Sequence, residues 1–209
     1  MQFVYGRENE KQMNAIIIGY GTVGKATQKV LKCDYVDKDD KDSDNKYTFA
    51  IICVKREDLP AAIERAKHYS DNMVIRSTIS PDDAYKYKDY TLWPEFNVTE
   101  TNGNGSDLWV MTENASFRNY LLHNYYESHT ICNVVTHKEA ALIKVWDNYR
   151  LMKEAELTLQ LAEICNKRDI CFDHIRNVLI QDTRHHDNYV DDTIKSECFN
   201  LAKEIVNNF

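Results

Sequence analysis

A glycine pattern near the start of the chain constrains the fold more than any other feature. Four apolar residues, 15–18, are followed by Gly19, Gly21 and Gly24 at G-x-G-x-x-G spacing. Residues 22–32 then have the apolar spacing of a helix with one inward face. A short strand, a glycine turn and a helix in this order are typical of the first half of a dinucleotide-binding unit.

Each glycine has a separate role in such a unit. Gly19 allows the tight turn, Gly21 lets the backbone approach a pyrophosphate, and Gly24 lets the helix pack closely on the strand. The free N–H groups at the start of the helix attract phosphate charge. We therefore predict that the turn binds a dinucleotide through Gly19, Tyr20, Gly21, Thr22, Val23 and Gly24.

An acidic residue follows at the expected distance. Asp37 ends a second short strand, 35–36, and lies eighteen positions after Gly19. A carboxylate about 20 residues after the first glycine accepts a hydrogen bond from a ribose 2′-hydroxyl and repels a 2′-phosphate, so NAD is preferred over NADP. Val54 and Thr78, which follow later strands, complete the predicted cofactor site, because ligands bind beyond the carboxyl ends of parallel strands.

Strands and helices alternate through the first 135 residues. The apolar run 48–54 is continuous, as expected of a strand buried on both faces of a parallel sheet. Further strands are predicted at 73–75, 90–93, 108–111 and 131–135, and helices at 58–69, directly after Ser80, and at 116–126. The alternation predicts an α/β fold, a Rossmann-type doubly wound parallel sheet, over residues 1–135.

Residues 136–209 have a different pattern and are predicted to be helical. Thr136 and Glu139 form a capping box, and no helix breaker follows until about residue 166. This long helix has two apolar stripes, one of which should face its own domain and the other a partner, most simply in a homodimer. The two stripes are Leu142, Val145, Trp146, Tyr149, Met152, Ala155, Leu159 and Ala162, and Leu151, Leu157, Leu161 and Ile164. Shorter helices are predicted at 173–180 and 193–207.

Composition excludes several classes of function. The chain of 209 residues has a net charge of −7, which argues against general nucleic-acid binding. No apolar run approaches the ~20 residues of a membrane span, and the first residues do not resemble a signal peptide. Six cysteines form no C-x-x-C pair, so reduced thiols and a cytoplasmic location are expected.

Four segments carry a resemblance to a known family. They read V-I-R-S-T-I-S-P at 74–81, P-E-F at 94–96, K-E-A-A-L-I-K-V-W-D-N at 138–148 and D-T-R-H-H-D-N-Y at 182–189. In this order after the glycine pattern, they resemble the UDP-glucose/GDP-mannose dehydrogenase family, with its K-S-T-V-P, P-E-F-L-R-E-G, E-A-A/E-x-x-K-x-x-x-N and D-x-R-I-G segments. The resemblance covers roughly residues 14–200.

The resemblance implies NAD-dependent, two-step oxidation of a sugar-nucleotide primary alcohol to a carboxylate, with a cysteine thioester as intermediate. By this resemblance Thr78 positions the catalytic water and Glu95 lies near it. Lys144 stabilises negative charge on the substrate oxygen, and Asn148 lies one turn further on. Because Lys144 and Asn148 are four residues apart, they share one helix face. Cys198 is the candidate nucleophile.

The chain departs from the family in ways that affect the predicted chemistry. Around Cys198 the sequence K-S-E-C-F-N-L lacks the glycines, proline, lysine and aspartate of the family's G-G-x-C-F/L-P-K-D segment. The arginine and second glutamate after P-E-F are also missing, and the chain ends at Phe209, without the family's C-terminal nucleotide-binding domain. The adjacent His185, His186 and Asp187 have no further ligands spaced to complete a metal site, so no metal is predicted.

Three functions therefore stay open. The first is an NAD-dependent sugar-nucleotide dehydrogenase of small size. The second is an NAD-binding protein without dehydrogenase activity. The third is a two-electron dehydrogenase of the 6-phosphogluconate or 3-hydroxyacid type, which uses a Lys-x-x-x-Asn pair without a cysteine and acts on another small-molecule substrate.

Overall fold

The computed structural model describes residues 13–96, 108–124, 131–179 and 181. The chain divides into two compact units, Met1–Asn148 and Tyr149–Phe209. The long helix α4 (His137–Lys167) is shared between them, so its first turns belong to the first unit. The functional division predicted at residue 135 is not tested by this packing. Cys198 and the helix predicted at 193–207 lie outside the described residues.

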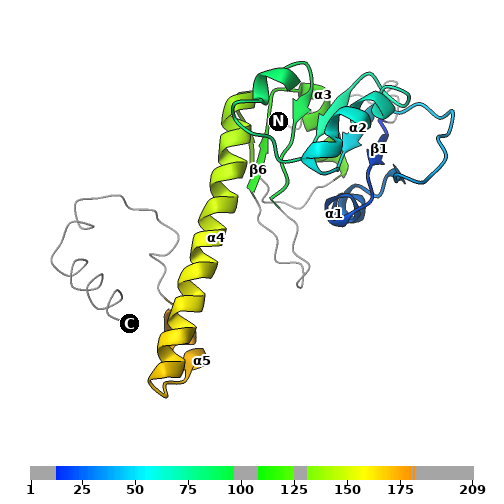
Figure 1. The fold of residues 1–209 in the computed structure, drawn as a ribbon. Helices are drawn as coiled ribbons and strands as arrows, with labels where there is room; N and C mark the ends of the chain where they lie inside the picture. Colours follow the sequence, from blue (N-terminus) through cyan, green and yellow to red (C-terminus); the bar gives the residue numbers. More distant parts are fainter. Residues whose placement is uncertain (1–12, 97–107, 125–130, 180, 182–209) are drawn as a thin grey trace, which may run out of the picture. The chain divides into compact units, whose positions relative to one another are not determined.

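The first unit contains a parallel sheet (Figure 1). Its elements before α4 are β1 (Ala15–Ile18), α1 (Thr22–Leu31), β2 (Asp34–Val36), β3 (Phe49–Ile52), the 3₁₀ turn η1 (Arg56–Asp58), α2 (Leu59–Ala66), β4 (Met73–Ile75), the 3₁₀ turn η2 (Ala84–Tyr87), β5 (Thr91–Leu92), β6 (Leu108–Met111), α3 (Ala115–Asn124) and β7 (Ile131–Val134). Five strands pair in the order β2-β1-β3-β4-β5, and β6 and β7 form a second parallel pair. The N–H of Thr112 donates to the carbonyl of Leu92 over 2.9 Å, which links the end of β6 to β5.

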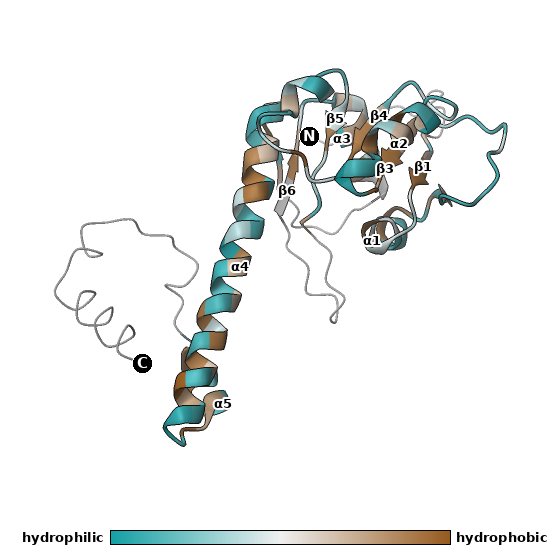
Figure 2. Ribbon diagram, viewed as in Figure 1, coloured by the Kyte–Doolittle hydropathy of each residue, from teal (hydrophilic) through white to brown (hydrophobic). Residues whose placement is uncertain are grey.

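Both faces of the larger sheet are covered, because alternate side chains of each strand point to opposite sides. On one face Ile16 and Ile18 pack in a core with Leu59 and Ile63 of α2. On the other, Ile17 packs in a core that contains side chains of α1 and α3. Figure 2 shows the strands as the most hydrophobic part of this unit. The predicted α/β fold with a doubly wound parallel sheet is confirmed.

The segment after Ser80 differs from the prediction. In place of a helix that begins there, the chain makes a turn and then the 3₁₀ helix η2. The hydroxyl of Ser80 accepts from the N–H of Asp82, and the N–H of Lys86 donates to the carbonyl of Asp83, a bond of 3₁₀ spacing. Local serine-to-backbone bonds of this kind compete with α-helical ones, so the capping residue favoured a turn.

The long helix begins as predicted. The N–H and hydroxyl of Thr136 donate to the Glu139 carboxylate over 2.8 and 2.7 Å, and the N–H of Glu139 donates back to the Thr136 hydroxyl over 3.3 Å. This capping box satisfies backbone donors that the first turn of a helix leaves without partners. α4 then runs for 31 residues.

Apolar side chains along α4 are more exposed than predicted. Among its described residues only Ala140, Ala141 and Cys165 are buried, while Trp146 is 61% and Leu159 71% exposed. Figure 2 shows hydrophobic and hydrophilic residues mixed along the whole helix. Periodicity in the sequence identified residues that share a helix face, but it could not identify what covers that face. No helix in the described part of the chain is both long and apolar enough to cross a membrane.

The capping box provides a test of what stabilises α4. We expect Thr136→Ala to lower the free energy of unfolding by about 1 kcal/mol, because the exposed cap is lost without any change in the core. Thr136→Ser keeps the hydroxyl and is the matched control. Urea unfolding followed by circular dichroism measures both variants, and an alanine variant as stable as the serine variant would contradict the role given to the cap.

Candidate functional site

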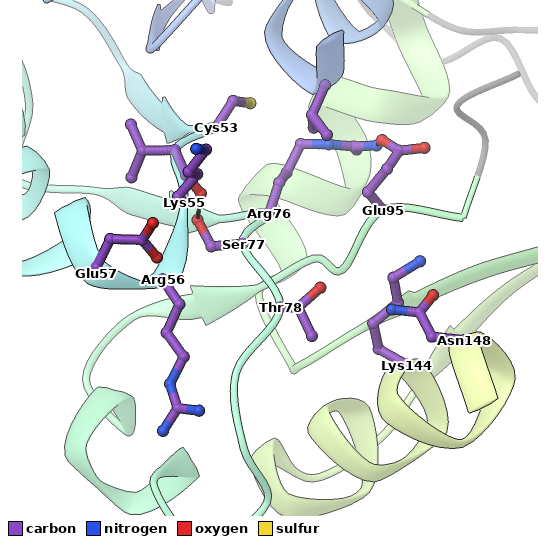
Figure 3. A pocket seen from close by; sticks show the side chains of 12 residues that line it. Cys53, Lys55, Arg56, Glu57, Arg76, Ser77, Thr78, Glu95, Lys144 and Asn148 are labelled. Atoms are coloured by element: carbon purple, nitrogen blue, oxygen red, sulfur yellow. Dashed lines mark hydrogen bonds and ion pairs between the residues drawn. The ribbon is translucent and has the colours of Figure 1, made fainter. Parts of the chain in front are cut away.

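A cavity of about 490 Å³ lies at the carboxyl ends of the parallel strands (Figure 3). β1 pairs with β2 on one side and with β3 on the other, so the strand order reverses at β1. Open parallel sheets bind ligands beyond the strand ends at such a reversal. The side chains that line the cavity come from α1, the segments after β3, β4 and β5, and the start of α4: Val23, Cys53, Val54, Lys55, Arg56, Glu57, Arg76, Ser77, Thr78, Glu95, Lys144 and Asn148.

The cavity brings together six of the residues predicted from the sequence, namely Val23, Val54, Thr78, Glu95, Lys144 and Asn148. The predicted catalytic residues Thr78, Glu95, Lys144 and Asn148 therefore share one site, although they come from three separate segments (Figure 3). The other predicted cofactor residues, Gly19, Tyr20, Gly21, Thr22, Gly24 and Asp37, lie in the turn before α1, in its first turn and at the end of β2. The roles predicted for all these residues stay predictions.

Two of the three glycines are required by the fold itself. Gly19 has φ +94°, and a Cβ there would lie 2.7 Å from Cγ1 of Val54. A Cβ on Gly24 would lie 2.1 Å from the carbonyl oxygen of Gly19, so only glycine allows this close approach of α1 to β1. Gly21 is different, because a Cβ there would have no atom within 4 Å. The fold therefore does not need glycine at position 21. A ligand that approaches the turn would need it, because a side chain there would block the approach.

The start of α1 is open to an anion. Gly21 is its N-cap, no side chain caps it, and its first turn has no acidic residue. Beside it, the N–H of Tyr20 donates to Oδ1 of Asp37 over 3.1 Å, and the rings of Tyr20 and Tyr35 stack with centroids 3.6 Å apart. Asp37 is therefore held beside the glycine turn, with its second carboxylate oxygen available.

A buried ion pair forms part of the cavity wall. Arg76 follows β4 and Glu95 follows β5; they are 5% and 6% exposed, and the Arg76 guanidinium donates to the Glu95 carboxylate. The guanidinium also lies 3.7 Å from the ring centroid of Trp93. Burial lowers the pKa of Arg76 to about 10, so it stays charged at neutral pH. Arg76 was not predicted from the sequence, although a basic and an acidic residue after neighbouring strands are a signal for such a pair.

Lys144 and Asn148 reach the cavity from successive turns of α4. Burial lowers the pKa of Lys144 below its ordinary value of 10.5; the charge of Asp147 opposes this shift and that of Arg76 adds to it. Its ammonium group lies 4.8 Å from the ring centroid of Phe96. A partly desolvated ammonium group is well suited to donate to an oxygen that gains negative charge in a reaction.

Cys53 is the cysteine that lines the cavity within the described part of the chain. Its side chain is buried and lies 3.8 Å from the hydroxyl of Thr27. Burial raises the pKa of this thiol to about 11, so it is protonated at neutral pH and a poor nucleophile. The same described residues contain no group of three or more His, Cys, Asp or Glu that could hold a metal ion.

Solved structures with the same fold are oxidoreductases. No protein-family model and no curated protein matches the sequence. A ternary complex of GDP-mannose dehydrogenase from Pseudomonas aeruginosa matches with a TM-score of 0.67 and 15% identity, over 94% of this chain and 64% of that one. A variant of the imine reductase from Myxococcus stipitatus in complex with NAD+ matches with a TM-score of 0.63 and 13% identity, over 90% and 77%.

A UDP-glucose dehydrogenase from Pyrobaculum islandicum also matches, with a TM-score of 0.59 and 13% identity, over 87% of this chain and 59% of that one. The chain thus spans less than two thirds of the length of the two sugar-nucleotide dehydrogenases. At these identities the likeness establishes the fold alone, which this chain shares with these dehydrogenases and this reductase.

The buried ion pair makes a prediction for stability. We expect Arg76→Met to lower the free energy of unfolding by about 3–5 kcal/mol, because it leaves the Glu95 carboxylate buried without its partner. Arg56→Met is the matched control, since Arg56 is 62% exposed in its ion pair with the partly buried Asp83, and this pair should be worth under about 1 kcal/mol. Adding Glu95→Leu to Arg76→Met should restore part of the loss. If Arg76→Met and Arg56→Met lower the free energy of unfolding in urea equally, the stabilising role of the buried ion pair would be contradicted.

Proposed function

We propose that the chain binds NAD at the carboxyl ends of its strands and serves as an NAD-dependent oxidoreductase. The observation that carries the proposal is the convergence of Thr78, Glu95, Lys144 and Asn148 on one cavity at the strand reversal. The open space at Gly21 fits a dinucleotide pyrophosphate, because a Cβ would stand where the ligand has to approach. The shared fold with NAD(P)-linked oxidoreductases gives further support.

In this proposal the residues divide into a cofactor end and a reaction end. The N–H groups at the start of α1 hold the pyrophosphate, and Asp37 accepts from a ribose hydroxyl. Val54 and Thr78 flank the nicotinamide end of the site. When bound, NAD supplies the acceptor for the hydride that leaves the substrate carbon. Lys144 donates to the substrate oxygen, and Asn148, on the same face, helps to orient it.

The substrate is proposed to be a sugar nucleotide, oxidised at its primary alcohol. The four segments that resemble the UDP-glucose/GDP-mannose dehydrogenase family support this class, as do the names of two structures with the same fold. In the full four-electron reaction a thiolate would hold the acyl intermediate and water would release it. Cys198 is the proposed nucleophile, and it lies outside the described residues.

A second candidate is a two-electron dehydrogenase that needs no cysteine. It is favoured by the state of Cys53, the cavity cysteine of the described chain, whose burial keeps it protonated. One hydride transfer needs no covalent intermediate: Lys144 and Asn148 would hold the substrate oxygen while its hydroxyl proton passes to water and the hydride leaves for the bound NAD. Formation of an aldehyde or ketone, with no acid, would distinguish this function from the first.

We also propose that α4 associates with α4 of a second copy in a homodimer. The exposed apolar side chains of this helix support the proposal, because large apolar areas on a protein surface mark interaction sites. Trp146, Met152, Leu157 and Leu159 are each 46% exposed or more. A second copy presents the same apolar surface, so an isologous contact would cover both.

The cofactor prediction tests Gly21. We expect calorimetric titration to detect NAD binding that is tighter than NADP binding. Gly21→Ala should weaken NAD binding at least about tenfold, because its methyl group occupies the approach to the pyrophosphate. Its free energy of unfolding should fall by no more than about 1 kcal/mol, since no atom lies near that position and only the N-cap preference for glycine over alanine is lost. Lys29→Ala, on the same helix, is the control, and an unaltered affinity in Gly21→Ala would contradict pyrophosphate binding at the turn.

The chemical prediction tests Lys144. With UDP-glucose or GDP-mannose and NAD, Lys144→Ala should lower kcat by about 100- to 1000-fold, as expected when an oxyanion donor is lost, and leave NAD affinity nearly unchanged. The charged ammonium group stabilises an oxyanion much better than the neutral amine, and its pKa lies below 10.5, so the rate should fall as pH rises through that lowered value. Lys144→Arg should move this fall to higher pH. If the unmodified protein turns over neither UDP-glucose nor GDP-mannose, the proposed substrate class would be contradicted.

The assembly prediction tests the exposed face of α4. We expect the unmodified protein to be a dimer at micromolar concentration by light scattering. Trp146→Glu or Met152→Glu should give monomers, because a charge would be buried in the contact. Lys153→Glu, a polar change on the same helix, should leave the dimer intact. A monomeric unmodified protein would contradict the proposed homodimer.

A further inference from the structure

Arg65 of α2 is one of several side chains that hold the charged segment between β2 and β3 in place. The sequence of this segment, D-K-D-D-K-D-S-D-N-K at 37–46, reads as a solvated surface loop, and its residues are exposed. Arg65 nevertheless bonds to it at three points. Its Nη1 donates to the carbonyl of Asp37, its Nη2 to the carbonyl of Asp40, and its Nε to the carboxylate of Asp42, each over 2.7 Å.

One of these bonds reaches Asp37, the residue predicted to bind the ribose, and Asp37 makes further bonds of its own. Its carbonyl accepts from Arg65, its N–H donates to Oδ2 of Asp40 over 2.8 Å, and its own carboxylate accepts from the N–H of Tyr20 over 3.1 Å. The main chain and side chain of Asp37 are therefore fixed before any ligand binds. The hydroxyl of Tyr69 donates to the carboxylate of Asp42 over 2.6 Å, and so helps to hold the carboxylate that Arg65 also contacts.

We propose that Arg65 is the positioning residue that sets the preference of this site for NAD over NADP. It does so by holding the backbone of Asp37 so that the free carboxylate oxygen points to the ribose hydroxyl. The inference rests on the proposed NAD site and adds a residue that the glycine pattern does not reveal. Arg65 lies twenty-eight positions after Asp37 and does not line the cavity, so it acts through the loop.

Arginine suits this role because its planar guanidinium donates in several fixed directions at once. A lysine would keep the charge beside Asp42 but could not hold two carbonyls and a carboxylate in one plane. Preorganised groups bind more tightly because the cost of ordering them is met during folding rather than during binding. Loss of the three bonds should therefore weaken the binding of NAD, which uses Asp37, more than the binding of NADP, which Asp37 repels.

A double-mutant cycle tests this with Arg65→Lys and Asp37→Ala. Arg65 holds the main chain of Asp37, so the bonds to the loop persist in Asp37→Ala and only the positioned carboxylate is lost. We expect Arg65→Lys to weaken NAD binding about five- to tenfold and NADP binding less than about twofold. In the Asp37→Ala background the same change should have almost no effect on NAD, because coupled residues are not additive.

Two controls separate positioning from general stability. Lys67→Ala removes a charge just after α2 that pairs with Glu64, and it should leave both affinities unchanged. Amide hydrogen exchange, measured without ligand, reports the loop itself. Arg65→Lys should speed exchange at Tyr20 and Asp37, whose N–H groups bond within this arrangement, while the amides of β3 keep their protection.

The outcomes are distinguishable. Equal weakening of NAD and NADP, additive with Asp37→Ala, would overturn the inference and make Arg65 a general stabiliser of the unit. Unchanged NAD affinity in Arg65→Lys, or weaker NAD binding without faster exchange at Tyr20 and Asp37, would also overturn it. If the unmodified protein binds neither dinucleotide, the proposed function fails first, and the role of Arg65 fails with it.

Discussion

The close approach of α1 to β1 is the constraint on which the candidate site depends. It exists because Gly24 has no Cβ, which would lie 2.1 Å from the carbonyl oxygen of Gly19. The contact places the uncapped start of α1 at the end of β1, beside the point where the strand order reverses. Every later feature of the site is arranged around this helix start. Asp37 is held to the N–H of Tyr20, and Val23 forms part of the cavity wall.

The charges in this unit are arranged in two ways that suit two tasks. Arg76 and Glu95 are buried and form an ion pair, so they shape the cavity wall and cost free energy if separated. Lys144 faces the cavity near the charge of Asp147, and burial lowers its pKa; in the proposed reaction its ammonium group donates to a substrate oxygen. Arg76, whose charge is paired with Glu95, suits a structural role. Lys144, whose charge faces the cavity, suits the chemical role proposed for it.

Local patterns predicted the fold well, and contacts between distant segments account for what was missed. The bounds of β4 and β6 match the prediction because each is an apolar run between polar residues. The ion pair of Arg76 and Glu95 depends on which strands become neighbours in the sheet. The bonds of Arg65 depend on the path of a polar loop. Neither contact produces a periodic pattern in the sequence. The six cavity residues were predicted because the end of a strand and the face of a helix can both be recognised from a single sequence.

In the proposed complex, the nicotinamide end of NAD lies beside Lys144 and the pyrophosphate lies at the start of α1. A crystal structure of the NAD complex tests this most directly. The account predicts the pyrophosphate against the backbone of Gly21, a ribose hydroxyl on Asp37, and an open space between the nicotinamide and the amine of Lys144. A complex in which Lys144 points away from the nicotinamide, or in which protein side chains fill that space, would contradict the account as a description of an enzyme.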